Sequence, residues 1–291
     1  MNLTKNRKPH KTLEELTLLD RFLFAEVMDH PENMQILLEI IFSREMAIQN
    51  GLQTEKEVRR DPGKRAIRVD VWAVDEEENV YSTEVQKRGT KNLPKRSRLY
   101  QGLIDSKLLP PGVTDFNLLN DVFIIIISPF DLFGYGRYRY TFRNQCLEVP
   151  ELYLEDGATR IFLNTRGQND NDESTELVEL LHYMEHTNVP GAAGTNKKLQ
   201  QLRANVRRIQ QDAEVGVRYM QAWEEIEYAK QEGRIEGRAQ GLEQGMEQGR
   251  VESLTASIKA LMNNLGKKPD EAMQILGIPE EERAMYLERL L

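Results

Sequence analysis

The spacing of apolar residues in the first part of the chain is that of amphipathic helices. Between residues 12 and 44, large apolar side chains recur every three or four positions, as they do on one face of an α-helix. His30-Pro31 interrupts the pattern, because the residue before a proline disfavours the helical conformation. The spacing therefore predicts two helices, at about 13–28 and 32–43.

The pattern then changes to that of strands. Residues 65–74 and 80–87 are extended in character and flank a polar break at 75–79, which predicts a β-hairpin. A helical pattern follows over 93–109, and the continuous apolar run at 120–128 is typical of a strand buried on both faces. Later strands are expected at 138–149 and 160–164. This order of elements predicts an α/β or α+β domain.

Shifts in composition divide the chain into four parts. We expect a basic arm at 1–11, a core domain at 12–187, a connecting region at 188–250 and a small helical unit at 251–291. The connecting region contains a linker, a charged helix and a glycine at every fourth position. These glycines are Gly233, Gly237, Gly241, Gly245 and Gly249. The glycine segment is either a flexible polar connector or a close-packed helix pair between protomers. If it is helical, it needs a partner, because five interior glycines cost a lone helix about 5 kcal/mol.

Composition and charge narrow the function classes. The 291 residues carry a net charge of −8, which argues against nucleic-acid binding over the whole surface. The single cysteine, Cys146, excludes a disulfide framework and a cysteine-rich zinc site, and we expect it to be buried within a strand. His182 and His186 have zinc-like spacing but no evident third ligand. With no long apolar run and no signal peptide, the sequence predicts a cytoplasmic protein without a membrane partner.

Three polar residues of the predicted hairpin indicate a metal site. Asp70 lies in the first strand, and Glu84 and Gln86 lie two positions apart on one face of the second. Antiparallel pairing about a turn centred on residue 77 brings Asp70 opposite Glu84. Acidic residues are uncommon in strands, and a bound cation would compensate their charge. Two carboxylates, water and a backbone carbonyl, for which Val85 is the candidate, suit Mg²⁺ or Mn²⁺.

The charge of the chain reverses directly after this predicted site. Between Gln86 and Gly102 there are several basic residues and no acidic one. The basic residues are Lys87, Arg88, Lys91, Lys95, Arg96 and Arg98. A metal-binding carboxylate pair beside a basic helix suits a phosphodiester, because the metal activates water and the basic groups hold phosphates. Alternatively, Asp70 and Glu84 are solvated charges on an edge strand, and the basic residues from Lys87 to Arg98 form a plain solvated helix face.

The ordered series of segments resembles the PD-(D/E)XK nuclease superfamily. It is most similar to the branch of Rpn-like recombination-promoting nucleases and putative transposases, over about residues 12–187. Asp70, Glu84 and Gln86 match the D…ExQ core of that branch. The other similar segments are Leu18–Val27 in the first helix, Arg96–Gln101 in the helix after the core, and the strands within Val122–Phe133 and Arg160–Gly167.

The resemblance implies a restriction-endonuclease-like core, with a central mixed sheet flanked by helices, and a helical C-terminal extension. Asp70 and Glu84 would bind the divalent ion, and Gln86 would position the attacking water where the superfamily usually has a lysine. A basic residue of the next helix could supply the missing charge, and Arg96 is the first candidate. The superfamily often adds an acidic residue from its first helix. The candidates for this residue are Asp20 and Glu39.

The implied activity is metal-dependent hydrolysis of DNA phosphodiester bonds in recombination, movement of mobile elements or phage defence. The expected contacts to DNA are Lys87, Arg88, Lys91, Lys95, Arg98 and Tyr100. Strand alternation should turn Lys87 away from the metal ligands. Because Gln86 carries no charge, the alternative is a weakly active or inactive nuclease fold that binds DNA or acts as an oligomeric interaction module. The C-terminal helical region is expected to form homo-oligomers.

Overall fold

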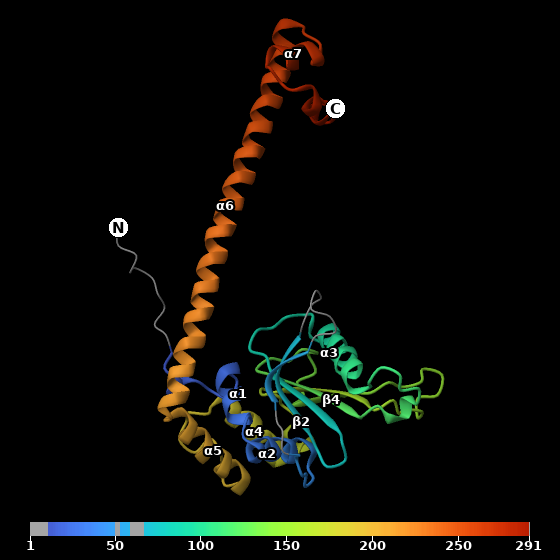
Figure 1. Cartoon of the computed structure of the whole chain (residues 1–291), viewed down its shortest axis with the longest axis vertical. Coiled ribbons are helices and arrows are strands. Elements are labelled where there is room, and N and C mark those ends of the chain that lie inside the picture. Colours follow the sequence, from blue (N-terminus) through green and yellow to red (C-terminus); the bar gives the residue numbers. More distant parts are fainter. Residues whose placement is uncertain (1–10, 50–52, 59–66, 291) are drawn as a thin grey trace. The chain divides into compact units, whose positions relative to one another are not determined.

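The computed structural model describes residues 11–49, 53–58 and 67–290; for 53–58 and 67–70 it describes the backbone alone. The chain divides into two compact units, Met1–Tyr219 and Met220–Leu291. The first unit contains a mixed sheet flanked by helices, which confirms the predicted α/β class (Figure 1). The second unit is helical, as predicted for the end of the chain.

The sheet of the first unit has six strands in the order β1-β2-β3-β4-β6-β5. The strands are β1 (Gln53–Val58), β2 (Ile67–Val74), β3 (Val80–Val85), β4 (Val122–Ser128), β5 (Arg139–Phe142) and β6 (Ala158–Asn164). β3, β4 and β6 are parallel to one another. The pairs β1–β2, β2–β3 and β5–β6 are antiparallel, so the candidate hairpin joins the antiparallel part of the sheet to its parallel centre.

Helices cover both faces of this sheet. Figure 1 shows α3 (Leu93–Leu108) on one face and a group of helices on the other. The group comprises α1 (Arg21–Met28), α2 (Pro31–Phe42), α4 (Thr175–Glu185) and α5 (Lys197–Gln210), in which α5 packs against α1 and α2. The buried apolar side chains form two clusters accordingly: a main core that includes residues of these four helices, and a second core that includes residues of α3.

Strand β4 separates the two cores. Ile125 and Ile127 belong to the main core, whereas Ile124 and Ile126 belong to the second core, because successive side chains of a strand point to opposite faces. All four side chains are buried. The continuous apolar run therefore forms a strand buried on both faces, as predicted.

Three local predictions need correction. A 3₁₀ turn at Leu13–Glu15 precedes α1, which begins only at Arg21, so the first helix is shorter than 13–28. The strand expected at 138–149 is limited to β5, and Cys146 lies beyond it, half-buried. Strand β1 was not predicted, because its sequence Gln-Thr-Glu-Lys-Glu-Val is almost entirely polar.

The first unit extends beyond the expected boundary at residue 187. Helix α5 places Leu199, Leu202 and Val206 in the main core. Residues 188–195 connect α4 to α5 through turns, and Ala193 is itself buried in that core. This segment is therefore part of the folded unit.

Helix α6 (Ala213–Leu265) begins in the first unit and continues into the second. It contains the five regularly spaced glycines, and an added Cβ at any of them would meet no atom within 4 Å apart from its chain neighbours and the adjacent backbone of the helix. The end of α6 packs with α7 (Pro269–Ile275) and α8 (Glu280–Leu290) around a small apolar core that includes Val251, Ile258 and Tyr286. Within the described residues, no helix has the length and apolar character needed to cross a bilayer.

Candidate functional site

The hairpin that carries the candidate ligands has the predicted register. Val71 pairs with Thr83, and Val74 pairs with Val80, on either side of the polar turn. These pairs are symmetric about residue 77, as expected. Asp70 and Glu84 are the next residues on their strands beyond the Val71–Thr83 pair. The side chain of Asp70 lies outside the described residues, so its convergence with Glu84 stays a prediction.

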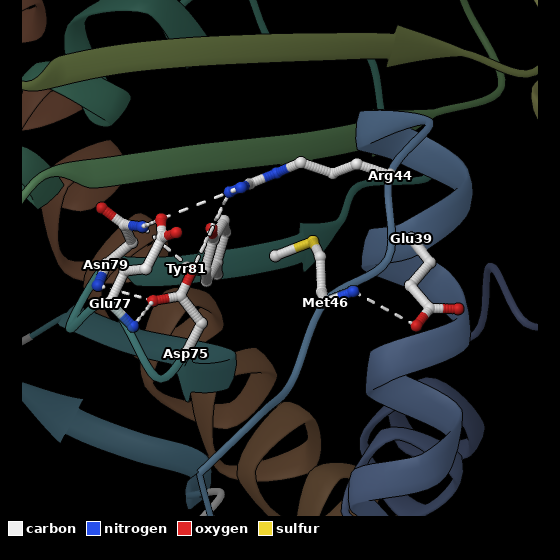
Figure 2. A network of polar contacts seen from close by, with 7 residues as sticks. All are labelled: Glu39, Arg44, Met46, Asp75, Glu77, Asn79 and Tyr81. Carbon is white, nitrogen blue, oxygen red and sulfur yellow. Dashed lines mark hydrogen bonds and ion pairs between the residues drawn. The ribbon is translucent and has the colours of Figure 1, made fainter.

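A buried aspartate fixes the turn of this hairpin. Asp75 is 4% exposed and accepts hydrogen bonds from the Glu77 amide (3.0 Å), the Asn79 amide (2.9 Å) and the Tyr81 hydroxyl (2.7 Å) (Figure 2). Burial raises the pKa of the Tyr81 hydroxyl well above its usual value, and the bond to Asp75 adds to this effect. Arg44 lies 3.9 Å from Asp75. The sequence pattern predicts only a polar turn at this segment.

Glu84 lies near the end of β3 and meets a cation from α3. The Arg96 Nη2 atom donates to Glu84 Oε1 and, at 3.0 Å, to Gln86 Oε1. Glu84 is in register with Ile126 and, through it, with Phe162. Both of these residues belong to the second core, so Glu84 is on the face that α3 covers. The structure therefore brings together three of the predicted catalytic residues.

The amide group of Gln86 is held at both ends. Its Oε1 atom accepts from Arg96, and its Nε2 atom donates to the Arg88 carbonyl oxygen at 2.8 Å. The guanidinium carbon of Arg96 lies 5.6 Å from the centre of the Tyr100 ring, a cation–π distance. Arg96 is thus placed by contacts with a strand end on one side and an aromatic ring on the other.

Lys87 points away from Glu84, as strand alternation predicts. Its Nζ atom lies 2.5 Å from Asp20 Oδ1, at the start of α1 on the opposite face of the sheet. The other carboxylate oxygen of Asp20 accepts from the Thr17 amide at 2.9 Å. The charge of Asp20, one of the two candidates for an additional acidic ligand, is therefore paired with Lys87.

Glu39, the other candidate, lies at the turn end of the hairpin. Figure 2 shows its carboxylate accepting from the Met46 amide (3.3 Å). It also accepts from Lys198 Nζ (2.8 Å), beside a cavity of about 540 Å³ that Asp75 also lines. Burial raises the pKa of Glu39, but hydrogen bonds from Lys198, from Gln35 and from the Met46 amide outweigh it and lower the pKa. About 13 Å of strand separates this end of β3 from Glu84, so Glu39 is not placed to share an ion with it.

The expected DNA contacts differ in their exposure. Lys87 is exposed despite its ion pair, and four further basic residues form an exposed group at and before the start of α3. They are Arg88, Lys91, Lys95 and Arg98. The prediction that Tyr100 contacts DNA needs correction. Tyr100 is 7% exposed and belongs to the second core, so its ring is not available to a nucleic acid. Its ring is instead the aromatic partner of Arg96.

Comparisons of the chain with protein-family models, with curated proteins and with solved structures found no match.

The chemistry of the donors fits a hard divalent cation. The carboxylate of Glu84 and the amide oxygen of Gln86 are oxygen ligands of the kind that Mg²⁺ and Mn²⁺ take. Val85, whose carbonyl was a further candidate, ends β3 with its side chain in the main core. Among the described residues, no three His, Cys, Asp or Glu side chains converge on a point that could hold a metal.

His182, considered for a zinc site, has a structural partner. Its Nε2 atom lies 3.1 Å from the Tyr138 hydroxyl, and the two rings are in edge-to-face contact. Burial, followed by hydrogen bonding to Asp170, raises the pKa of Tyr138 to about 12. These contacts account for His182 without a metal.

Proposed function

We propose that this protein is a divalent-metal-dependent DNA endonuclease. The convergence of Glu84, Gln86 and Arg96 at the end of β3 carries the proposal. The resemblance assigns the first two residues to the site, and Arg96 reaches them from the following helix. A mixed sheet in which the D…ExQ hairpin precedes a covering helix supports a restriction-endonuclease-like fold for the first unit.

Each residue has a role that its chemistry supports. Asp70 and Glu84 would hold Mg²⁺ or Mn²⁺, which when bound activates water and offsets charge on the phosphate. Arg96 would balance the negative charge that develops on the phosphate, the task of the usual superfamily lysine. Gln86 keeps Arg96 in place and can accept or donate a hydrogen bond to water. The exposed basic residues before and within α3 would hold flanking phosphates.

The negative total charge restricts how DNA could be bound. A net charge of −8 repels a polyanion, so contact would be confined to the basic face beside the site. Binding of this kind weakens steeply as salt is raised, because it depends on release of counterions. As the resemblance suggests, the substrate would be cellular or phage DNA in the cytoplasm, during recombination, movement of mobile elements or defence.

Nicking of a supercoiled plasmid in Mg²⁺ or Mn²⁺ tests the proposal. Asp70→Asn and Glu84→Gln should each abolish nicking, because they remove the charge that would hold the ion. Glu76→Gln is a matched control, since Glu76 is an exposed carboxylate in the turn of the same hairpin. Equal nicking by all four proteins would exclude the assignment.

A second candidate function is a non-catalytic DNA-binding or interaction module. It is favoured by Gln86, which lacks the charge of the usual lysine, and by Arg96, which already engages Glu84. Salt-sensitive DNA binding without nicking in any divalent metal would support this function over the nuclease.

Homo-oligomers would form through α6. Ile235, Leu242 and Met246 are 62%, 65% and 68% exposed, and their spacing of seven and four residues places them along one side of the helix. A lone helix with five interior glycines has little intrinsic stability. The same helix of a second copy would cover these apolar side chains and compensate the cost of the glycines.

A further inference from the structure

The carboxylate of Glu84 is already in contact with a permanent cation. Arg96 Nη2 donates to both Glu84 Oε1 and Gln86 Oε1, and the Arg96 and Glu84 side chains are only 25% and 11% exposed. An arginine does not lose its proton in a protein. Any divalent cation that reaches Glu84 must therefore compete with a guanidinium group rather than with water alone.

One hydrogen-bond donor of Arg96 lacks an acceptor within the described part of the chain. Its Nε atom is buried and has no hydrogen-bond partner among the described residues, although buried N–H groups normally have one. The stack on Tyr100, in contrast, requires only that the guanidinium stay over the ring. The contacts of Arg96 thus allow its terminal nitrogens to exchange one acceptor for another while the guanidinium stays over the Tyr100 ring.

We propose that Arg96 competes with the divalent ion for Glu84 and transfers to a phosphate oxygen of the substrate when the ion binds. This inference rests on the proposed function. Metal ion and guanidinium repel each other if both remain on one carboxylate, so binding of the ion releases Arg96. A phosphate is a suitable new acceptor, because arginine pairs with phosphate as it does with carboxylate. The resting protein would bind metal weakly, and metal and DNA would favour each other's binding.

The test measures Mn²⁺ affinity of the full chain by isothermal titration calorimetry without DNA. Arg96→Gln should bind Mn²⁺ about tenfold more tightly than the wild type, which corresponds to about 1.4 kcal/mol. Lys107→Gln is the matched control, because it removes one positive charge from the same helix at an exposed position outside the candidate site and should leave the Mn²⁺ affinity unchanged. If Arg96→Gln does not fold, Arg96→Met keeps the apolar stem and makes the same comparison.

A second measurement separates this role from a structural one. At saturating Mn²⁺, Arg96→Gln should nick plasmid more slowly than the wild type although it binds the ion more tightly. General damage to the site would weaken metal binding and nicking together. Unchanged or weaker Mn²⁺ binding by Arg96→Gln, with a wild type that binds and nicks, would overturn this inference and leave the proposed function intact. Failure of the wild type and all variants to bind Mn²⁺ would overturn both.

Discussion

Replacement of Asp75 by alanine tests how the hairpin of the candidate site is held in place. The Asp75 carboxylate accepts hydrogen bonds from the Glu77 amide, from the amide and side chain of Asn79 and from the Tyr81 hydroxyl. Alanine removes these acceptors at once. The Tyr81 hydroxyl, in a side chain that is 0% exposed, then loses its acceptor.

We expect Asp75→Ala to lower the free energy of unfolding of the first unit by about 3 kcal/mol. An unsatisfied buried hydroxyl costs about 1–3 kcal/mol, and each hydrogen bond of the more exposed turn contributes about 0.5–1 kcal/mol. Asp75→Asn is the matched control. It keeps one oxygen for the turn amides and presents an NH₂ group to Tyr81, whose oxygen can accept, so the expected loss is about 1 kcal/mol.

Urea unfolding followed by the fluorescence of Trp72 measures the effect. Trp72 is 5% exposed and lies in β2, paired with Ser82 of β3. A Trp223→Phe background removes the other tryptophan, so the signal reports the first unit. Tyr81→Phe should cost less in the Asp75→Ala protein than in the parent, because the shared bond is already lost. An unchanged midpoint for Asp75→Ala, or equal effects of Tyr81→Phe in both proteins, would refute the reasoning.

Three further predictions concern the site, the pH dependence and the assembly. Gln86→Lys places a second cation beside Arg96 and should slow plasmid nicking about tenfold or more; addition of Arg96→Gln should restore most of the rate, and a double variant no faster than Gln86→Lys would contradict this. A hydrogen bond from Arg166 lowers the pKa of Glu185, so the stability from this pair is present above the unfolded pKa of about 4.3 and lost as the pH falls. The difference in urea midpoint between wild type and Glu185→Gln should therefore shrink on acidification, and a difference that grows would be inconsistent. Leu242→Glu should reduce the mass measured by light scattering to that of a monomer, whereas an unchanged oligomer would exclude this face of α6.

Local patterns were sufficient where one strong signal determined the structure. The polar break between two extended segments fixed the register of β2 and β3, because side-chain alternation leaves one pairing that keeps both apolar faces buried. The isoleucine run of β4 could belong only to a strand covered on both sides. The helix after the hairpin was placed to within one residue, since Pro110 directly follows its C-cap residue, Leu109.

The burial of Tyr100 could have been predicted from the sequence. Leu93 lies seven residues before it and Ile104 four residues after it, which places all three side chains on one side of α3.

Other features depend on contacts that a local pattern does not contain. Strand β1 carries no apolar signal because it is an edge strand. The contact of Arg96 with Glu84 depends on the distance and angle at which α3 packs on the sheet, and no spacing along the sequence determines these quantities.

The positive charge of the candidate site is coupled to the packing of α3. A lysine at position 86 would be placed by β3 itself, since alternation fixes the face to which its side chain points. Arg96 is placed instead by a helix, whose Leu93, Tyr100 and Ile104 pack in the second core. Lys87, the next residue in sequence, pairs with Asp20 on the opposite face and cannot replace Arg96 without reversing the alternation. In the proposed nuclease, the charge that acts on the phosphate therefore depends on how a helix packs, which gives a physical reason for weaker or more conditional activity than a lysine on the strand would provide.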